Sequence, residues 1–141
     1  MNRSTLTRAS LAVLAFAALS VGLPAAFAPE TFYEDYPFFT AWINLLPPYN
    51  EHLITDVGGL YVGFGLLFVW SLVKPSAQLI LPVCVAWFVT QILHFAFHIS
   101  HLEGFTTTDA TAQTVGLAVI TLVPVIPIAN VVASKRPGRS R

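Results

Sequence analysis

Four apolar segments of about 20 residues each determine what this chain can fold into. They span about 9–28, 53–73, 77–99 and 112–133. A helix rises ~1.5 Å per residue, so each segment is long enough to cross a hydrocarbon layer ~30 Å thick. Only 10% of the 141 residues are charged, against roughly 25% in soluble domains. The sequence therefore predicts an all-α integral membrane protein, with residues 1–141 forming a single four-helix transmembrane bundle in the lipid bilayer.

The charged residues are sorted between the two sides of this predicted bundle. The basic residues precede the first segment, follow the second or follow the fourth: Arg3, Arg8, Lys74, Lys135, Arg136, Arg139 and Arg141. The acidic residues lie in or beside the other connections: Glu30, Glu34, Asp35, Glu51, Asp56, Glu103 and Asp109. The positive-inside rule then predicts a multi-pass protein of the bacterial cytoplasmic membrane, with both termini and a basic tail (134–141) inside. No basic patch indicates a nucleic-acid partner.

The first segment has two interpretations. A basic start, an apolar stretch and the small residues Ala26 and Ala28 around Phe27 resemble a secretory signal peptide with its cleavage site. Pro29 follows that site directly and disfavours cleavage. We therefore expect a retained helix, with a cleaved signal as the alternative.

The long connection at 29–50 is rich in aromatic residues. Its rings belong to Phe32, Tyr33, Tyr36, Phe38, Phe39, Trp42 and Tyr49. Aromatic side chains favour the membrane–water boundary, so this connection is expected to lie along the outer interface as an aromatic belt. A gate for a substrate or lipid is the alternative. The lone cysteine, Cys84, excludes an intramolecular disulfide.

Polar residues within the last three segments fall on helical stripes with alternating steps of three and four. The stripe of the second segment is His52, Asp56, Gly59, Gly63, Leu66 and Trp70. That of the third is Cys84, Trp87, Gln91, His94, His98 and His101. That of the fourth is Asp109, Gln113, Gly116, Ile120, Val123, Pro127 and Asn130. Polar groups in lipid turn inward, so the stripes are expected to face one another, with Gly59 and Gly63 allowing close helix packing.

The polar ends of these stripes predict an outward-facing cup of histidines and carboxylates. Matching the depths of the helices at ~1.5 Å per residue places Asp56 near His98, Tyr61 near His94 and His52 near His101. Imidazole and carboxylate ligands suit Zn, Cu or Fe, and histidines four apart on one helix can share an ion.

Two metal sites are conceivable in this cup. One combines His94 and His98 with Asp56, and the other combines His98 and His101 with His52, with Glu51 or Glu103 as a further ligand. A b-type haem held by histidines from two helices is an alternative. A further alternative has the histidines bonded to Asp56, Gln91 and Gln113, so that they join helices or handle protons.

The stretch ITDVGGLYVGFGLLFVWSLVKP (54–75) resembles small bacterial four-helix membrane proteins of the DoxX-like group. The resemblance rests on the glycine pattern, the leading acid and the Lys-Pro turn, and it extends over the last three segments. It implies a four-helix bundle that accompanies membrane redox systems. The histidines match no motif of that group.

The sequence favours a small membrane accessory protein whose outer cup binds a transition metal or haem. One alternative is a structural or assembly subunit of a larger membrane complex, in which the protein partners are other subunits or further copies of the chain. A second alternative is a small membrane enzyme that uses carboxylate–histidine acid–base chemistry.

Overall fold

The computed structural model describes residues 2–46 and 48–134, which form helices and no strand. The elements are α1 (Arg3–Phe27), α2 (Pro29–Asp35), the 3₁₀ helix η1 (Ile43–Leu45), α3 (Glu51–Val73), α4 (Ala77–Ile99), α5 (Thr107–Leu122) and α6 (Val125–Ser134). Four helical stretches are long and apolar enough to cross a membrane: α1, α3, α4 and the continuous α5–α6 segment. The predicted all-α fold with four such helices is confirmed. Most of the predicted basic tail, from 135 on, lies outside the described residues.

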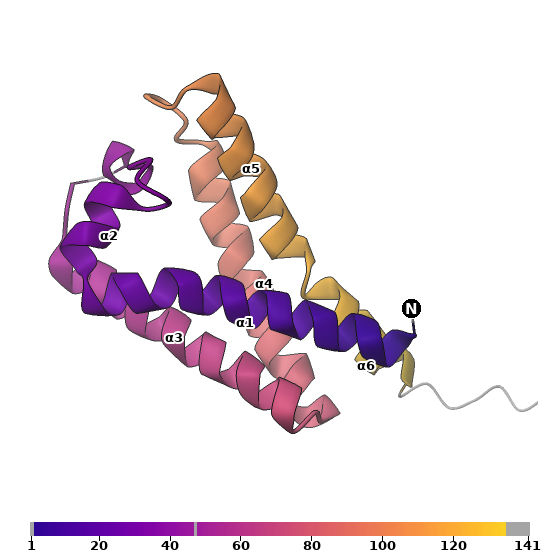
Figure 1. The fold of residues 1–141 in the computed structure, drawn as a ribbon. Helices are drawn as coiled ribbons and strands as arrows, with labels where there is room; N and C mark the ends of the chain where they lie inside the picture. Colours follow the sequence, from indigo (N-terminus) through magenta and orange to yellow (C-terminus); the bar gives the residue numbers. More distant parts are fainter. Residues whose placement is uncertain (1, 47, 135–141) are drawn as a thin grey trace, which may run out of the picture.

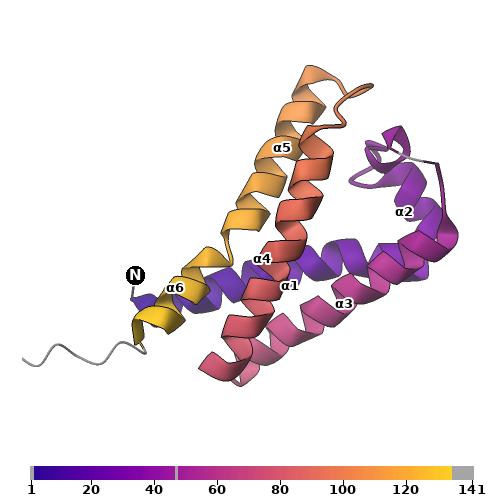
Figure 2. The ribbon, with the colours of Figure 1, turned by 180° about the vertical axis from the view of Figure 1, so that it is seen from behind.

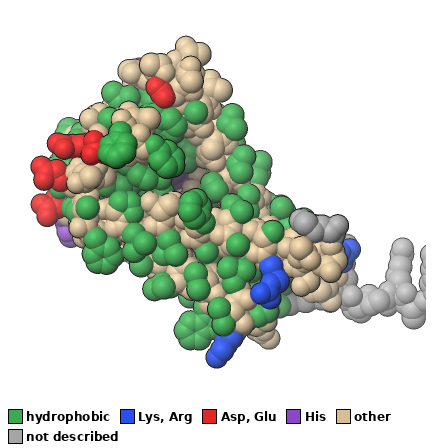
Figure 3. All heavy atoms as spheres, viewed as in Figure 1, with side chains coloured by type: hydrophobic (Ala, Val, Ile, Leu, Met, Phe, Trp, Pro, Cys, Tyr) green, Lys and Arg blue, Asp and Glu red, His purple; other side chains and the backbone are tan. Residues whose placement is uncertain are grey.

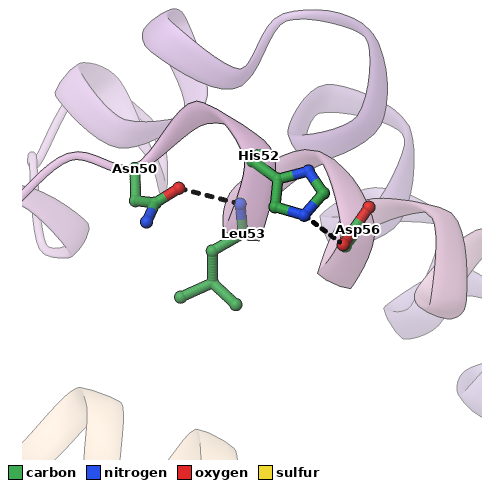
Figure 4. A network of polar contacts seen from close by, with 4 residues as sticks. All are labelled: Asn50, His52, Leu53 and Asp56. Carbon is green, nitrogen blue, oxygen red and sulfur yellow. Dashed lines mark hydrogen bonds and ion pairs between the residues drawn. The ribbon is translucent and has the colours of Figure 1, made fainter.

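Side-chain caps fix where the long helices begin. Asn2, Asn50, Ser76 and Thr106 each accept a hydrogen bond from the backbone N–H three residues later, which satisfies one of the orphan donors of a helix start. Figure 4 shows the Asn50 cap, from which α3 begins. A cap at Thr108 or Asp109 was also expected for the last span, but Thr106 takes that role and the helix begins earlier.

The fourth span is broken at a proline, as its sequence predicts. α5 ends at Leu122 and α6 begins at Val125, on either side of Pro124. Proline lacks the N–H that would continue the helical ladder, and its ring clashes with the preceding turn. After the break, α6 packs against α1, where the Asn130 amide donates to the Thr7 hydroxyl at 3.0 Å.

Glycines bring α1 and α3 into the most extensive helix pair of the molecule. A Cβ atom added to Gly58 would collide with the backbone of Ala25 and Ala26, and one added to Gly22 would lie 2.7 Å from the Val62 nitrogen. Ala25 and Ala26 stand directly before the cleavage site expected for a signal peptide, so here that segment is a packed part of the fold. Only glycine allows backbones to approach this closely.

The glycines that pack differ from those that the stripe predicted. Gly59 and Gly63 have open space around their Cβ positions, whereas Gly58 and Gly65 are buried. The prediction of close packing at Gly59 and Gly63 within this bundle is therefore wrong. Adjacent residues of a helix point about 100° apart, so a shift of one position changes which face meets α1.

The helices converge at one end and diverge at the other. α3 and α4 meet at the short turn after Val73 and separate with distance from it (Figures 1 and 2). The core lies where α1, α3, α4 and α6 come together. Its buried members are Leu11, Leu14, Ala15, Ala18, Phe68, Ile80, Val83, Cys84, Trp87 and Val131. Trp87 is the centre of this core, with the rings of Tyr61, Phe64 and Phe68 packed edge-to-face around it at 5.3–5.4 Å.

The connection between α1 and α3 folds back as a small aromatic cap. α2 follows α1 directly after Ala28, buries Phe32 and brings Tyr33 within 5.3 Å of Tyr49. Burial raises the pKa of the Tyr36 hydroxyl, and a hydrogen bond with Ser20 opposes that rise. In Figure 3 the acidic side chains gather at this divergent end, and the lysine and arginine side chains lie toward the other end. The charge sorting seen in the sequence is therefore also a sorting in space.

Replacing Gly58 with Ala should destabilise the fold, because the added methyl group meets backbone that cannot move aside. Overpacking of this kind typically costs about 1–3 kcal/mol. The matched control is Gly116→Ala on α5, where nothing lies within 4 Å and the better helix propensity of alanine contributes up to about 1 kcal/mol. Unfolding in detergent, followed by circular dichroism, measures both. Equal effects of the two changes would contradict the α1–α3 contact.

Candidate functional site

The five residues predicted to hold a metal fall into separate places in the structure. His94 and His98 lie side by side on α4, and His52 and Asp56 form a pair on α3. His101 stands apart from both pairs. Within residues 2–46 and 48–134, no three His, Cys, Asp or Glu side chains come close enough to hold a metal ion together. The predicted cup is therefore not assembled within one chain.

The pair on α3 is exposed. The His52 Nε2 atom lies 3.3 Å from Asp56 Oδ2, and the two side chains are 87% and 60% exposed (Figure 4). The residues are one helical turn apart, so the pair forms within α3 and needs no other element. An exposed ion pair of this spacing contributes only about 0.3–0.5 kcal/mol. It does not by itself explain why these residues occur here.

The pair on α4 is more enclosed. The imidazole rings of His94 and His98 are 4.4 Å apart between centroids and meet edge-to-face. His98 is 6% exposed, and its Nδ1 atom lies 2.7 Å from the Oε1 atom of Gln113 on α5. Among the described residues, His94 makes no hydrogen bond through its ring. His98 is thus fixed across two helices, whereas the His94 ring is left free.

His101 interacts only with its own helix. Its ring stacks on that of Phe97 at 4.1 Å, and its Nδ1 atom donates to the Phe97 carbonyl oxygen at 2.8 Å. The side chain lies at the exposed end of α4. It is not presented toward His94 or His98, because its ring is held back along the preceding turn.

The predicted pairs between α3 and α4 are wrong for Asp56 with His98 and for His52 with His101. Asp56 pairs with His52, and His98 pairs with Gln113. Depth matching assumed that α3 runs alongside α4 over its whole length. Instead, α3 follows α1 and leaves α4 beyond the turn that connects them (Figure 1). The alternative in which His98 bonds to Gln113 is the one that the contacts support.

Other polar side chains also join helices. The Gln91 amide donates to the Tyr61 hydroxyl at 2.9 Å, which links α4 to α3. The Thr121 hydroxyl lies 3.4 Å from the Gln91 carbonyl oxygen and links α5 to α4. Sequence reasoning placed Gln91 in the interior but missed Tyr61 as its partner, and it missed Thr7 as the partner of Asn130. The polar positions of the first span were the only available signal for Thr7.

No protein-family model matches this chain, and neither a curated protein nor a solved structure shows significant similarity to it. The resemblance of α3 and its neighbours to the DoxX-like group stays a prediction.

The His98–Gln113 contact should be measurable as a coupling between α4 and α5. The variants His98→Phe and Gln113→Leu each leave one buried polar group unpaired, whereas the double variant removes both. Hydrogen bonds between membrane helices give coupling free energies of about 0.6 kcal/mol on average and up to about 1.7 kcal/mol in double-mutant cycles. Unfolding of the four proteins in detergent should give a coupling in this range. The control cycle combines His101→Phe with Gln113→Leu, whose effects should add. A cycle with no coupling would contradict the contact.

Proposed function

We propose that this chain is a structural subunit of the bacterial cytoplasmic membrane that assembles with a second copy of itself through α3. Its acidic, divergent end faces outward, in keeping with the position of its basic residues. The observation that carries the proposal is the exposed stripe of α3, formed by His52, Asp56, Gly59, Gly63, Leu66 and Trp70.

This stripe lies opposite the face that α3 uses inside the chain. The buried residues of α3 are Gly58, Gly65, Phe68 and Ser71, which contact α1 and the core. The side chains of Leu66 and Trp70 are each 60% exposed, and Gly59 and Gly63 have nothing within 4 Å. A helix surface with a polar pair, two glycines and two large apolar residues in one line is poorly suited to lipid alone. It is well suited to another helix, because small residues four apart allow close backbone approach.

A second copy fits this surface because of symmetry. Two copies inserted in the same direction pack α3 against α3 in parallel, around a two-fold axis along the membrane normal. Gly59 and Gly63 then face the same residues of the partner. His52 and Asp56, which pair within one exposed turn of the single chain, gain reciprocal His–Asp contacts across the axis. This arrangement gives the stripe the interior position that its sequence pattern favours.

Bulky residues in the stripe should abolish the dimer without unfolding the chain. Gly59→Leu and Gly63→Leu place side chains into open space of the monomer, so the fold tolerates them, but they separate the two copies of α3. Gly116→Leu on α5 is the matched control and should leave the dimer intact. Energy transfer between labelled copies in lipid nanodiscs or vesicles, measured against protein-to-lipid ratio, gives the dimer fraction.

Cross-linking tests which face of α3 meets the partner. In a Cys84→Ala background, Leu66→Cys should form a disulfide dimer on oxidation, whereas Leu60→Cys, which is 66% exposed on another face, should not. Equal cross-linking at both positions, or a monomer at every protein-to-lipid ratio, would overturn the proposal. A cross-link to a protein of another mass in native membranes would replace the second copy with a different membrane subunit.

A further inference from the structure

We infer that His94 and His98 form a two-nitrogen binding site for a monovalent copper ion, Cu(I), which Gln113 orients from α5. The site does not involve the α3 stripe, so it goes beyond the proposed assembly role and can stand or fail without it.

The spacing of the two histidines suits a shared ion. They are one turn apart on α4, with their ring centroids 4.4 Å apart. Histidines at i and i+4 on one helix face are a recurring metal-binding pair. His94 makes no hydrogen bond within the described residues, so its ring can turn about its own side-chain bonds toward the ion while His98 stays fixed.

The contact with Gln113 prepares His98 to be a ligand. An amide oxygen only accepts hydrogen bonds, so the 2.7 Å contact with Oε1 places the proton on Nδ1 of His98. The lone pair of the neutral ring is then on Nε2, the atom that would face the ion. Metal-binding histidines typically donate their second N–H to an oxygen acceptor in this way, which fixes both the tautomer and the ring orientation.

The glutamine amide is only half satisfied. Gln113 is 5% exposed, and its Nε2 atom is buried without a hydrogen-bond partner among the described residues. A polar contact whose only role is to join two helices would be expected to satisfy both ends of the amide, because a buried unpaired donor is costly. The amide here satisfies the end that orients His98, which is the requirement of a ligand site.

The surroundings select the charge of the ion. Both ligands are neutral, and within the described chain no carboxylate or thiol joins them in a group of three. The cost of transferring an ion from water into apolar surroundings rises with the square of its charge, so a monovalent ion is favoured over a divalent one. Zn²⁺ also requires about four ligands, whereas Cu(I) is stable with two nitrogen ligands in line. The ring of Phe97, 5.9 Å from that of His98, helps to shield such a site from water.

The test measures Cu(I) binding by the full-length protein in detergent. Cu(I) is kept reduced with ascorbate and offered in competition with bicinchoninate, whose colour reports the copper that it retains. The wild-type protein should take up one Cu(I) per chain. His94→Ala and His98→Ala should each abolish this uptake, and Gln113→Leu should weaken it about 10- to 100-fold. His101→Ala and Cys84→Ala are the matched controls and should bind as the wild type does.

Two further measurements separate binding from folding. His94 has no hydrogen bond to lose, so His94→Ala should keep the wild-type melting temperature while it loses copper. X-ray absorption of the loaded protein should show two-coordinate Cu(I) with nitrogen ligands. Gly59→Leu should bind Cu(I) normally even if it no longer dimerises, which keeps this inference distinct from the assembly proposal. Uptake by the His94→Ala/His98→Ala double variant equal to that of the wild type, or a stronger retention of Zn²⁺ than of Cu(I), would overturn the inference.

Discussion

The close approach of α1 and α3 is the contact on which the rest of the structure depends. Gly58 lies against the backbone of Ala25 and Ala26, and Gly22 lies against the start of the Val62 turn. Because α3 is held along α1 in this way, it does not follow α4 beyond their common turn. The separation of the two helices then decides where the polar groups of α3 and α4 lie, and therefore which of them can meet. A four-helix arrangement with parallel neighbours would have produced a different set of contacts from the same side chains.

The extents of the helices were predictable from the sequence, because the signals for them are local. α3 ends at Val73 and α4 spans Ala77–Ile99, as the apolar segments and the intervening Lys-Pro turn indicate. The break at Pro124 follows from the chemistry of one residue. The inward position of Trp87, Gln91 and His98 followed from the cost of polar and bulky amphipathic groups in lipid, and these three residues are buried.

The pairing of the helices was not predictable in the same way. Glycines at 58, 59, 63 and 65 offer two faces of α3 for close packing, and nothing local shows which face meets α1. The first span was also left out of the stripe comparison, since it resembled a signal peptide, although it is the main partner of α3. Of the candidate site, the pair of His94 and His98 was predictable from its spacing along one helix. The expected contribution of Asp56 and His52 required knowledge of helix neighbours, which spacing within a single helix does not contain.

The hydrogen bond between Asn130 and Thr7 connects residues that are separated by 123 positions. Because a membrane protein is inserted as it is synthesised, α1 and α3 can pair well before α6 exists. The last span then enters beside a partner that has waited for it, and its bend at Pro124 turns it toward the first turns of α1. The order of biogenesis is therefore written into the topology: an early hairpin-like pair provides the template, and the final ten-residue helix, Val125–Ser134, completes the inner end of the molecule as it leaves the ribosome.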